Sequence, residues 1–91
     1  MARSGSPSWW VYILRCGDGT LYTGIALDVP ARLAQHRAGI GARYTRGREP
    51  LELVYQEPSP SRSAATRREA AIKRCSRGEK LLLIQSIGVP E

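Results

Sequence analysis

The sequence has few residues of the types that build metal clusters, covalent frameworks or membrane spans. Its 91 residues include no phenylalanine, no asparagine, one histidine and two cysteines. Cys16 and Cys75 lie far apart and outside any Cys-x-x-Cys or Cys/His spacing, which excludes a four-ligand structural zinc site. We expect no disulfide, and a cytoplasmic location is the default expectation. No apolar run approaches the roughly 20 residues that a bilayer span needs, so we expect no membrane insertion.

The length and composition predict one small domain. Ninety-one residues are too few for two stable cores, and 42% hydrophobic residues are too many for a disordered chain. Residues 1–8 contain one arginine and no apolar stretch, so we expect a disordered N-terminal tail rather than a secretory signal. We place the domain at residues 9–85 and a C-terminal tail at residues 86–91.

Positive charge exceeds negative charge along the chain. Lysine and arginine number 14 against 8 acidic residues, which gives a net charge of +6. Twelve of the 14 are arginine, whose planar guanidinium suits two-point contact with phosphate. A net charge of either sign also keeps a protein soluble, so charge alone allows both interpretations. We expect contact with nucleic acid.

The apolar pattern and the turn and cap residues predict the element order β-β-α-β-α-α. The expected strands are 9–16, 21–26 and 51–55, and Pro58 and Pro60 mark the region where the third strand should end. The expected helices are 28–38, 61–75 and 76–84, and a basic loop is expected over 41–50. Asp28 is a candidate N-cap, as is Ser61 or Ser63, and Ser76 with Glu79 has the form of a capping box. This order predicts an α+β fold with a three-stranded, mostly antiparallel sheet and helices packed against it.

The loop of the expected hairpin decides whether two tyrosines share a face. A two-residue turn at Asp18 and Gly19 would place Tyr12 and Tyr22 on opposite faces of the sheet. A three-residue loop with a left-handed Gly19 would place them on the same face. Both alternatives are open at the level of sequence, and both tyrosines can also be ordinary strand residues.

Two further places could carry chemistry. His36, the single histidine, follows Arg32 by four residues, so both project from one side of a helix at the border between core and solvent. Glu69 is the one carboxylate in a stretch that holds six cations. The first pair can also be an ordinary exposed helix face. Glu69 can be a ligand for a hard divalent metal or simply an ion-pair partner of Lys73 or an arginine.

Together these positions resemble the GIY-YIG nuclease family. Trp10-Val11-Tyr12 stands at the place of the Gly-Ile-Tyr motif, and Tyr22-Thr23-Gly24 stands at the place of Tyr-Ile-Gly. Arg32, His36 and Glu69 complete the pattern. The resemblance covers about residues 9–84 and is greatest to the small, stand-alone, single-domain bacterial members. The glycine and isoleucine of the first motif are replaced here by tryptophan and valine.

The resemblance implies a divalent-metal-dependent DNA endonuclease, structure-selective in DNA repair or recombination. The resemblance also implies that Glu69 holds one Mg²⁺ or Mn²⁺ and that Arg32 binds the scissile phosphate. Tyr12 positions or deprotonates the attacking water, Tyr22 orients the water or the phosphate, and His36 takes the proton onward. Gly24 is expected to be structural, because it lets the backbone pass close to its neighbours.

DNA contact then falls to the basic surface of the domain itself. The candidate phosphate contacts are Arg43, Arg46, Arg48, Arg67, Arg68 and Arg74. Because 91 residues leave no room for an added DNA-binding domain, we also expect that a protein partner could supply target choice. The alternatives to an autonomous nuclease are a non-cleaving nucleic-acid-binding module and a nuclease subunit that needs such a partner.

Overall fold

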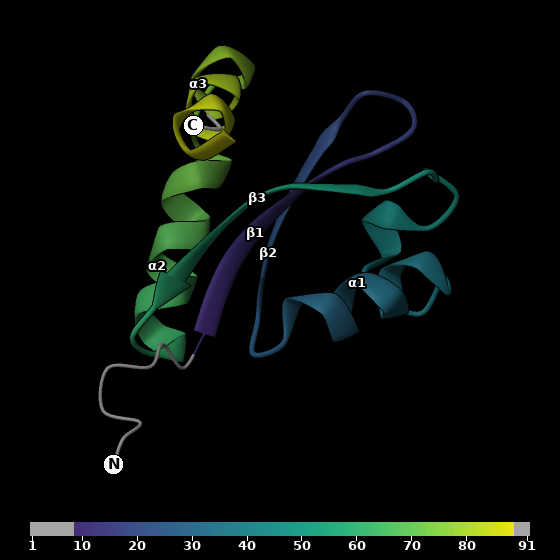
Figure 1. Ribbon diagram of the computed structural model, residues 1–91, viewed down its shortest axis with the longest axis horizontal. Helices are drawn as coiled ribbons and strands as arrows, with labels where there is room; N and C mark the ends of the chain where they lie inside the picture. The colour runs from purple at the N-terminus through teal and green to yellow at the C-terminus, as the bar shows by residue number, and fades with distance from the viewer. Residues whose placement is uncertain (1–8, 89–91) are drawn as a thin grey trace.

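A computed structural model describes residues 9–88, with side chains up to Ser86. The expected tail at residues 1–8 lies outside the described residues, as do residues 89–91. Figure 1 shows the elements, whose bounds are β1 Trp9–Arg15, β2 Leu21–Ala26, α1 Val29–Arg37, a 3₁₀ turn η1 Arg43–Thr45, β3 Glu52–Ser59, α2 Arg62–Lys73 and α3 Arg77–Gly88. Among these residues no helix is both long and apolar enough to cross a bilayer.

The three strands form one antiparallel sheet in the order β2-β1-β3. The central position of β1 explains why apolar residues occupy both of its faces. Helix α1 lies on one side of the sheet, and α2 with α3 lies on the other (Figure 1). The predicted α+β fold is confirmed.

Alternate residues of β1 supply two separate clusters of buried side chains. Val11 and Ile13 pack with Ala65 and Ile72 of α2, on the face that α3 also covers. Tyr12 and Leu14 point the other way, toward α1. Because the strand period is two residues, one strand carries both the core under α2 and the tyrosine of the first motif.

The hairpin has the three-residue loop. Cys16 N–H donates to the carbonyl oxygen of Thr20 at 2.9 Å, and Gly19 is left-handed with φ of 86°. The resulting register pairs Tyr12 with Gly24, two residues beyond Tyr22. The two tyrosines therefore lie on the same face of the sheet, as the three-residue alternative predicts.

The expected helix starts are confirmed by their hydrogen bonds. Asp28 caps α1 and Ser61, rather than Ser63, caps α2, each through its side-chain oxygen. Ser76 and Glu79 form the reciprocal capping box at α3, with bonds of 2.8 and 3.1 Å. These capping bonds join residues that are three apart in the sequence, so they can be predicted from the sequence alone.

The later elements agree with the sequence prediction in part. Strand β3 ends at Ser59, between Pro58 and Pro60, as predicted, and it passes through Pro58 because an edge strand tolerates a residue without N–H. Helix α3 continues to Gly88 and so enters the segment expected as a tail from residue 86, because residues 79–87 contain neither proline nor glycine. The basic loop contains the 3₁₀ turn η1.

The core under α2 should dominate stability. Replacing Ile72, which is 1% exposed, by alanine should lower the free energy of unfolding by about 2–5 kcal/mol through lost burial and the cavity left behind. Leu82, 68% exposed on α3, is the matched control, and Leu82→Ala should change the value by less than about 0.5 kcal/mol. Urea unfolding measures both. Equal losses from the two substitutions would contradict this location of the core.

Candidate active site

A chain of three buried polar side chains links β1, α1 and η1. The Tyr12 hydroxyl lies 2.8 Å from Nε2 of His36, and Nδ1 of His36 lies 2.8 Å from Oγ1 of Thr45. Thr45 Oγ1 in turn donates to the carbonyl oxygen of Ala42 at 3.0 Å. Tyr12 is 1% exposed, and His36 and Thr45 are fully buried. Burial of this kind requires each polar group to have a partner, and each has one.

The contacts of the His36 ring are compatible with two tautomers. In the first, the Thr45 hydroxyl gives its proton to the Ala42 carbonyl oxygen and accepts from Nδ1–H. Nε2 then carries the lone pair, and the Tyr12 O–H donates to it. The Ala42 N–H approaches Nδ1 at 3.4 Å, a longer contact that belongs to the other tautomer. The surroundings of Nδ1 can therefore satisfy the ring in either state.

Two glycines make room for this chain. A methyl group at Gly24 on β2 would lie 2.6 Å from the Tyr12 hydroxyl oxygen, so only glycine lets that hydroxyl extend over the edge strand. A methyl group at Gly41 would lie 2.5 Å from Nδ1 of His36. Gly24 thus has the expected structural role, and the group that it lets approach closely is the side chain of Tyr12.

The predicted position of His36 at the border of core and solvent is wrong. Its ring is fully buried, because Tyr12, Tyr22 and Thr45 surround it. Sequence reasoning also missed Thr45, which lies nine residues further along, in a segment expected as loop. Only the alternation of small and polar residues around the basic loop could have suggested a buried threonine there.

The titration behaviour of the chain follows from burial. Burial, with a smaller contribution from Tyr22, raises the pKa of Tyr12 to about 12, against the opposing effect of Arg32. Burial and the Arg32 guanidinium lower the pKa of His36 below its usual 6.5. Burial also raises the pKa of Tyr22, although Lys73 and Arg32 oppose it. At neutral pH both tyrosines are therefore protonated and His36 is neutral.

Arg32 and Glu69 complete the site from two helices. Arg32, on α1, is partly buried and donates to the side-chain oxygen of Gln35 at 2.8 Å. The Glu69 side chain, on α2, is 20% exposed, and its Oε2 lies 3.3 Å from Lys73 Nζ. Arg32 and Glu69 both lie close enough to affect the pKa of Tyr12. The five predicted residues, Tyr12, Tyr22, Arg32, His36 and Glu69, thus gather beside the edge strand β2.

Comparison with known proteins shows the family of the chain. The GIY-YIG catalytic domain family matches residues 8–81. The chain belongs to the GIY-YIG family. A UPF0213 protein of Streptococcus sanguinis is 53% identical over 76 residues, which cover 84% of this chain and 87% of that one. A UPF0213 protein of Desulfotalea psychrophila is 48% identical over 81 residues, covering 88% and 74% of the two chains.

Solved structures show the same GIY-YIG fold. The solution NMR structure of a UPF0213 protein from Bacillus halodurans has 45% sequence identity and a TM-score of 0.59, covering 90% of this chain and 87% of that one. The solution NMR structure of an Enterococcus faecalis protein has 33% identity and a TM-score of 0.60, covering 90% and 88%. The relatives are thus small bacterial proteins, similar to this chain over most of their length.

The donor set of this GIY-YIG site suits a hard divalent cation that is shared with a substrate. Among residues 9–88 no group of three Asp, Glu, His or Cys side chains could enclose a metal ion. Among the five site residues Glu69 alone offers a carboxylate, and Mg²⁺ commonly binds through one or two carboxylates together with water and phosphate oxygens. Oxygen donors also suit Mn²⁺. The chemistry of the site therefore fits Mg²⁺ or Mn²⁺, and Glu69, whose Oε2 also contacts Lys73, is the residue that would hold the ion.

The basic residues expected to contact DNA fall into two groups. Arg48 pairs with Asp18 at the hairpin tip, and Arg68 donates to both carboxylate oxygens of Glu57 at 2.8 and 3.2 Å. Within the described part of the chain the other four make no ion pair and are exposed. These four are Arg43, Arg46, Arg67 and Arg74.

The lowered pKa of His36 predicts how stability depends on pH. Between that value and 6.5 the unfolded chain binds a proton that the folded chain does not, so the free energy of unfolding should fall as pH drops below about 6.5. Asp18, whose pKa Thr20 and Arg48 lower to about 2, does not titrate there. Urea unfolding between about pH 7.5 and 5.5 measures the fall.

His36→Gln is the control, because it removes the titrating ring and should flatten the dependence over this range. An NMR titration of the wild-type ring gives an independent reading. An apparent pKa of 6.5 or above for His36 would contradict the prediction.

Proposed function

We propose that this GIY-YIG protein is a divalent-metal-dependent endonuclease that hydrolyses phosphodiester bonds in DNA. The observation that carries the proposal is the buried hydrogen bond from Tyr12 to His36, beside Arg32 and the carboxylate of Glu69. Binding of DNA alone requires cations on a surface and no buried proton acceptor. A tyrosine hydroxyl that is hydrogen-bonded to a neutral imidazole can pass its proton to that imidazole, which supports a role in proton transfer.

The proton path begins at the attacking water. With a pKa of about 12, Tyr12 is a poor base unless its own proton leaves as it accepts another. Neutral His36 accepts that proton at Nε2, while Nδ1–H stays bonded to Thr45. Water thus loses a proton to the Tyr12 oxygen, and His36 becomes an imidazolium. Because the pKa of His36 is lowered, the imidazolium then gives this proton back to the Tyr12 oxygen, and the proton already on that oxygen leaves to solvent.

The phosphorus–oxygen step needs positive charge as well as a base. The water oxygen attacks phosphorus, the bond to the 3′-oxygen breaks, and solvent protonates the leaving oxygen. In this proposal Arg32 binds the scissile phosphate and stabilises its growing negative charge. Tyr22, which lies 5.3 Å from His36 between ring centres, can orient the water or the phosphate. A divalent ion held by Glu69 would act as a Lewis acid toward the phosphate and the leaving oxygen.

Removing the carboxylate of Glu69 should abolish cleavage and preserve DNA binding. Glu69→Ala should give no metal-dependent product, with affinity equal to or slightly above wild type because a negative charge near phosphate is lost. A gel assay with labelled duplex, single-stranded, flapped and four-way DNA in Mg²⁺ or Mn²⁺ measures cleavage. EDTA supplies the metal-free control.

Glu52→Gln is the matched control, because Glu52 is an exposed carboxylate on β3, 3.9 Å from Arg15, and it should cleave as wild type does. Metal-dependent cleavage by Glu69→Ala would refute the metal role. Wild-type binding without cleavage on every substrate would instead favour the non-cleaving module, or a subunit whose partner supplies targeting.

Of the six predicted DNA contacts, the four exposed arginines that make no ion pair, Arg43, Arg46, Arg67 and Arg74, should supply most of the phosphate contacts. If all four engage, the logarithm of the binding constant should fall with the logarithm of salt concentration at a slope of about −3 to −4. Arg43→Ala combined with Arg46→Ala should make that slope shallower by about 2. Fluorescence anisotropy across a salt series measures it. Arg68→Ala, whose guanidinium already binds Glu57, is the control and should change the slope least.

A further inference from the structure

Tyr44 is the most exposed tyrosine of the chain and lies next to the site. It is 41% exposed, in contrast to the buried Tyr12 and Tyr55. Its ring stacks against that of Tyr22, with centres 5.8 Å apart and planes tilted by 27°. Tyr22 in turn contacts the His36 ring. The exposed ring of Tyr44 is therefore separated from the buried His36 ring by Tyr22 alone.

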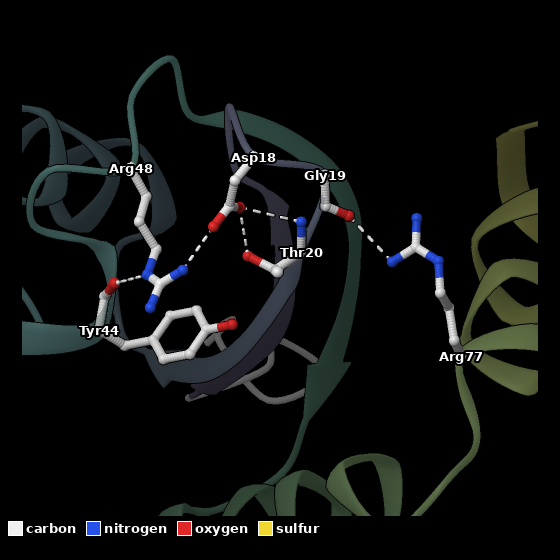
Figure 2. Close-up of polar contacts among 6 residues, drawn as sticks. All are labelled: Asp18, Gly19, Thr20, Tyr44, Arg48 and Arg77. Atoms are coloured by element: carbon white, nitrogen blue, oxygen red, sulfur yellow. Dashed lines mark hydrogen bonds and ion pairs between the residues drawn. The ribbon is translucent and has the colours of Figure 1, made fainter.

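Arg48 covers part of Tyr44 with its guanidinium. The guanidinium carbon lies 4.3 Å from the centre of the Tyr44 ring, and Nε donates to the Tyr44 carbonyl oxygen at 2.7 Å. The same guanidinium pairs with Asp18, as Figure 2 shows. Because Asp18 offsets its charge, Arg48 is less suited to phosphate than its neighbours Arg43 and Arg46. One face of the guanidinium lies on the Tyr44 ring, and with the side chain 38% exposed the opposite face is offered for stacking.

The segment that carries Tyr44 is held in place before any ligand arrives. Thr45 is bonded to His36, and Gly17 N–H donates to the Arg48 carbonyl oxygen at 2.6 Å. At the hairpin tip Asp18 accepts from the N–H and the hydroxyl of Thr20. On the other side of the tip, Arg77 of α3 donates to the Gly19 carbonyl oxygen at 2.9 Å (Figure 2). A fixed aromatic ring loses little conformational entropy when it binds.

We propose that Tyr44 and Arg48 form a stacking surface for one unpaired base of the DNA strand, beside the phosphate that is cut. The inference rests on the proposed function and specifies its substrate class. Arg43 and Arg46, exposed on the same segment, would contact phosphates of the same strand. Aromatic rings and guanidinium planes both stack on nucleobases.

A stacking surface of this kind selects against fully paired DNA. Inside a duplex each base face is covered by its neighbours, and only the base edges reach the grooves. A ring can stack on a base only where the strand is single, flapped or opened. The site should therefore act on the unpaired nucleotides next to a junction or in a single strand.

Binding measurements with an abasic nucleotide test the proposal without cleavage. Fluorescein-labelled flap DNA is titrated with the full chain in EDTA, with a single abasic site at each of the first unpaired positions in turn. Tyr44→Leu, which keeps an apolar cover over Tyr22, should weaken binding to the intact flap about fivefold to a hundredfold. With the abasic site at the stacked position, wild type should bind about as weakly as this variant.

Two further variants separate stacking from other effects. Tyr44→Trp should bind the intact flap as wild type does, because it keeps an aromatic face. Arg46→Ala, which removes a charge, should weaken intact and abasic flaps equally. If Tyr44→Leu does not fold, quenching of 2-aminopurine fluorescence at the same position by wild type gives the answer directly.

The outcomes distinguish this inference from the proposed function. Equal weakening of intact flap, abasic flap and duplex by Tyr44→Leu, or an unquenched 2-aminopurine at every position, would overturn the stacking surface alone. Salt-dependent binding of wild type would persist in that case. Absence of wild-type binding to any DNA would overturn the proposed function together with it.

Discussion

The hydrogen bond between the Tyr12 hydroxyl and Nε2 of His36 is the interaction on which the site depends. It joins the central strand to α1, and it needs the left-handed Gly19 to set the register and Gly24 to leave space at the edge. The other ring nitrogen, Nδ1, lies against Thr45, so both nitrogens of His36 have a side-chain partner. The acid–base chemistry of the site therefore depends on one 2.8 Å hydrogen bond, whose geometry the backbone conformation sets.

Much of the fold follows from local signals in the sequence. The caps at Asp28 and Ser76 act over three residues, and the alternation along β1 places its two sets of side chains on opposite faces. The sequence allows two registers for the hairpin, because the register depends on whether Gly19 adopts the left-handed conformation. Pattern and propensity describe single elements well, and they carry less information about where an element ends.

The site was predictable only in part, because its contacts join distant segments. Spacing along α1 associates Arg32 with His36, but the burial of that histidine depends on strands and on a turn elsewhere in the chain. Similarly, the sequence treats all six candidate arginines alike. The structure separates them, since Asp18 and Glu57 approach two of them from other elements. The sequence gives the number of arginines, but only the tertiary structure shows which of them are exposed and make no ion pair.

The position of Thr45 on the short turn η1 makes the orientation of the imidazole depend on a loop. The two apolar clusters contain no residue of the segment between α1 and β3. Nδ1 of His36 nevertheless takes its partner from that segment. A shift of the loop that left both clusters intact would therefore still remove the contact that orients the ring.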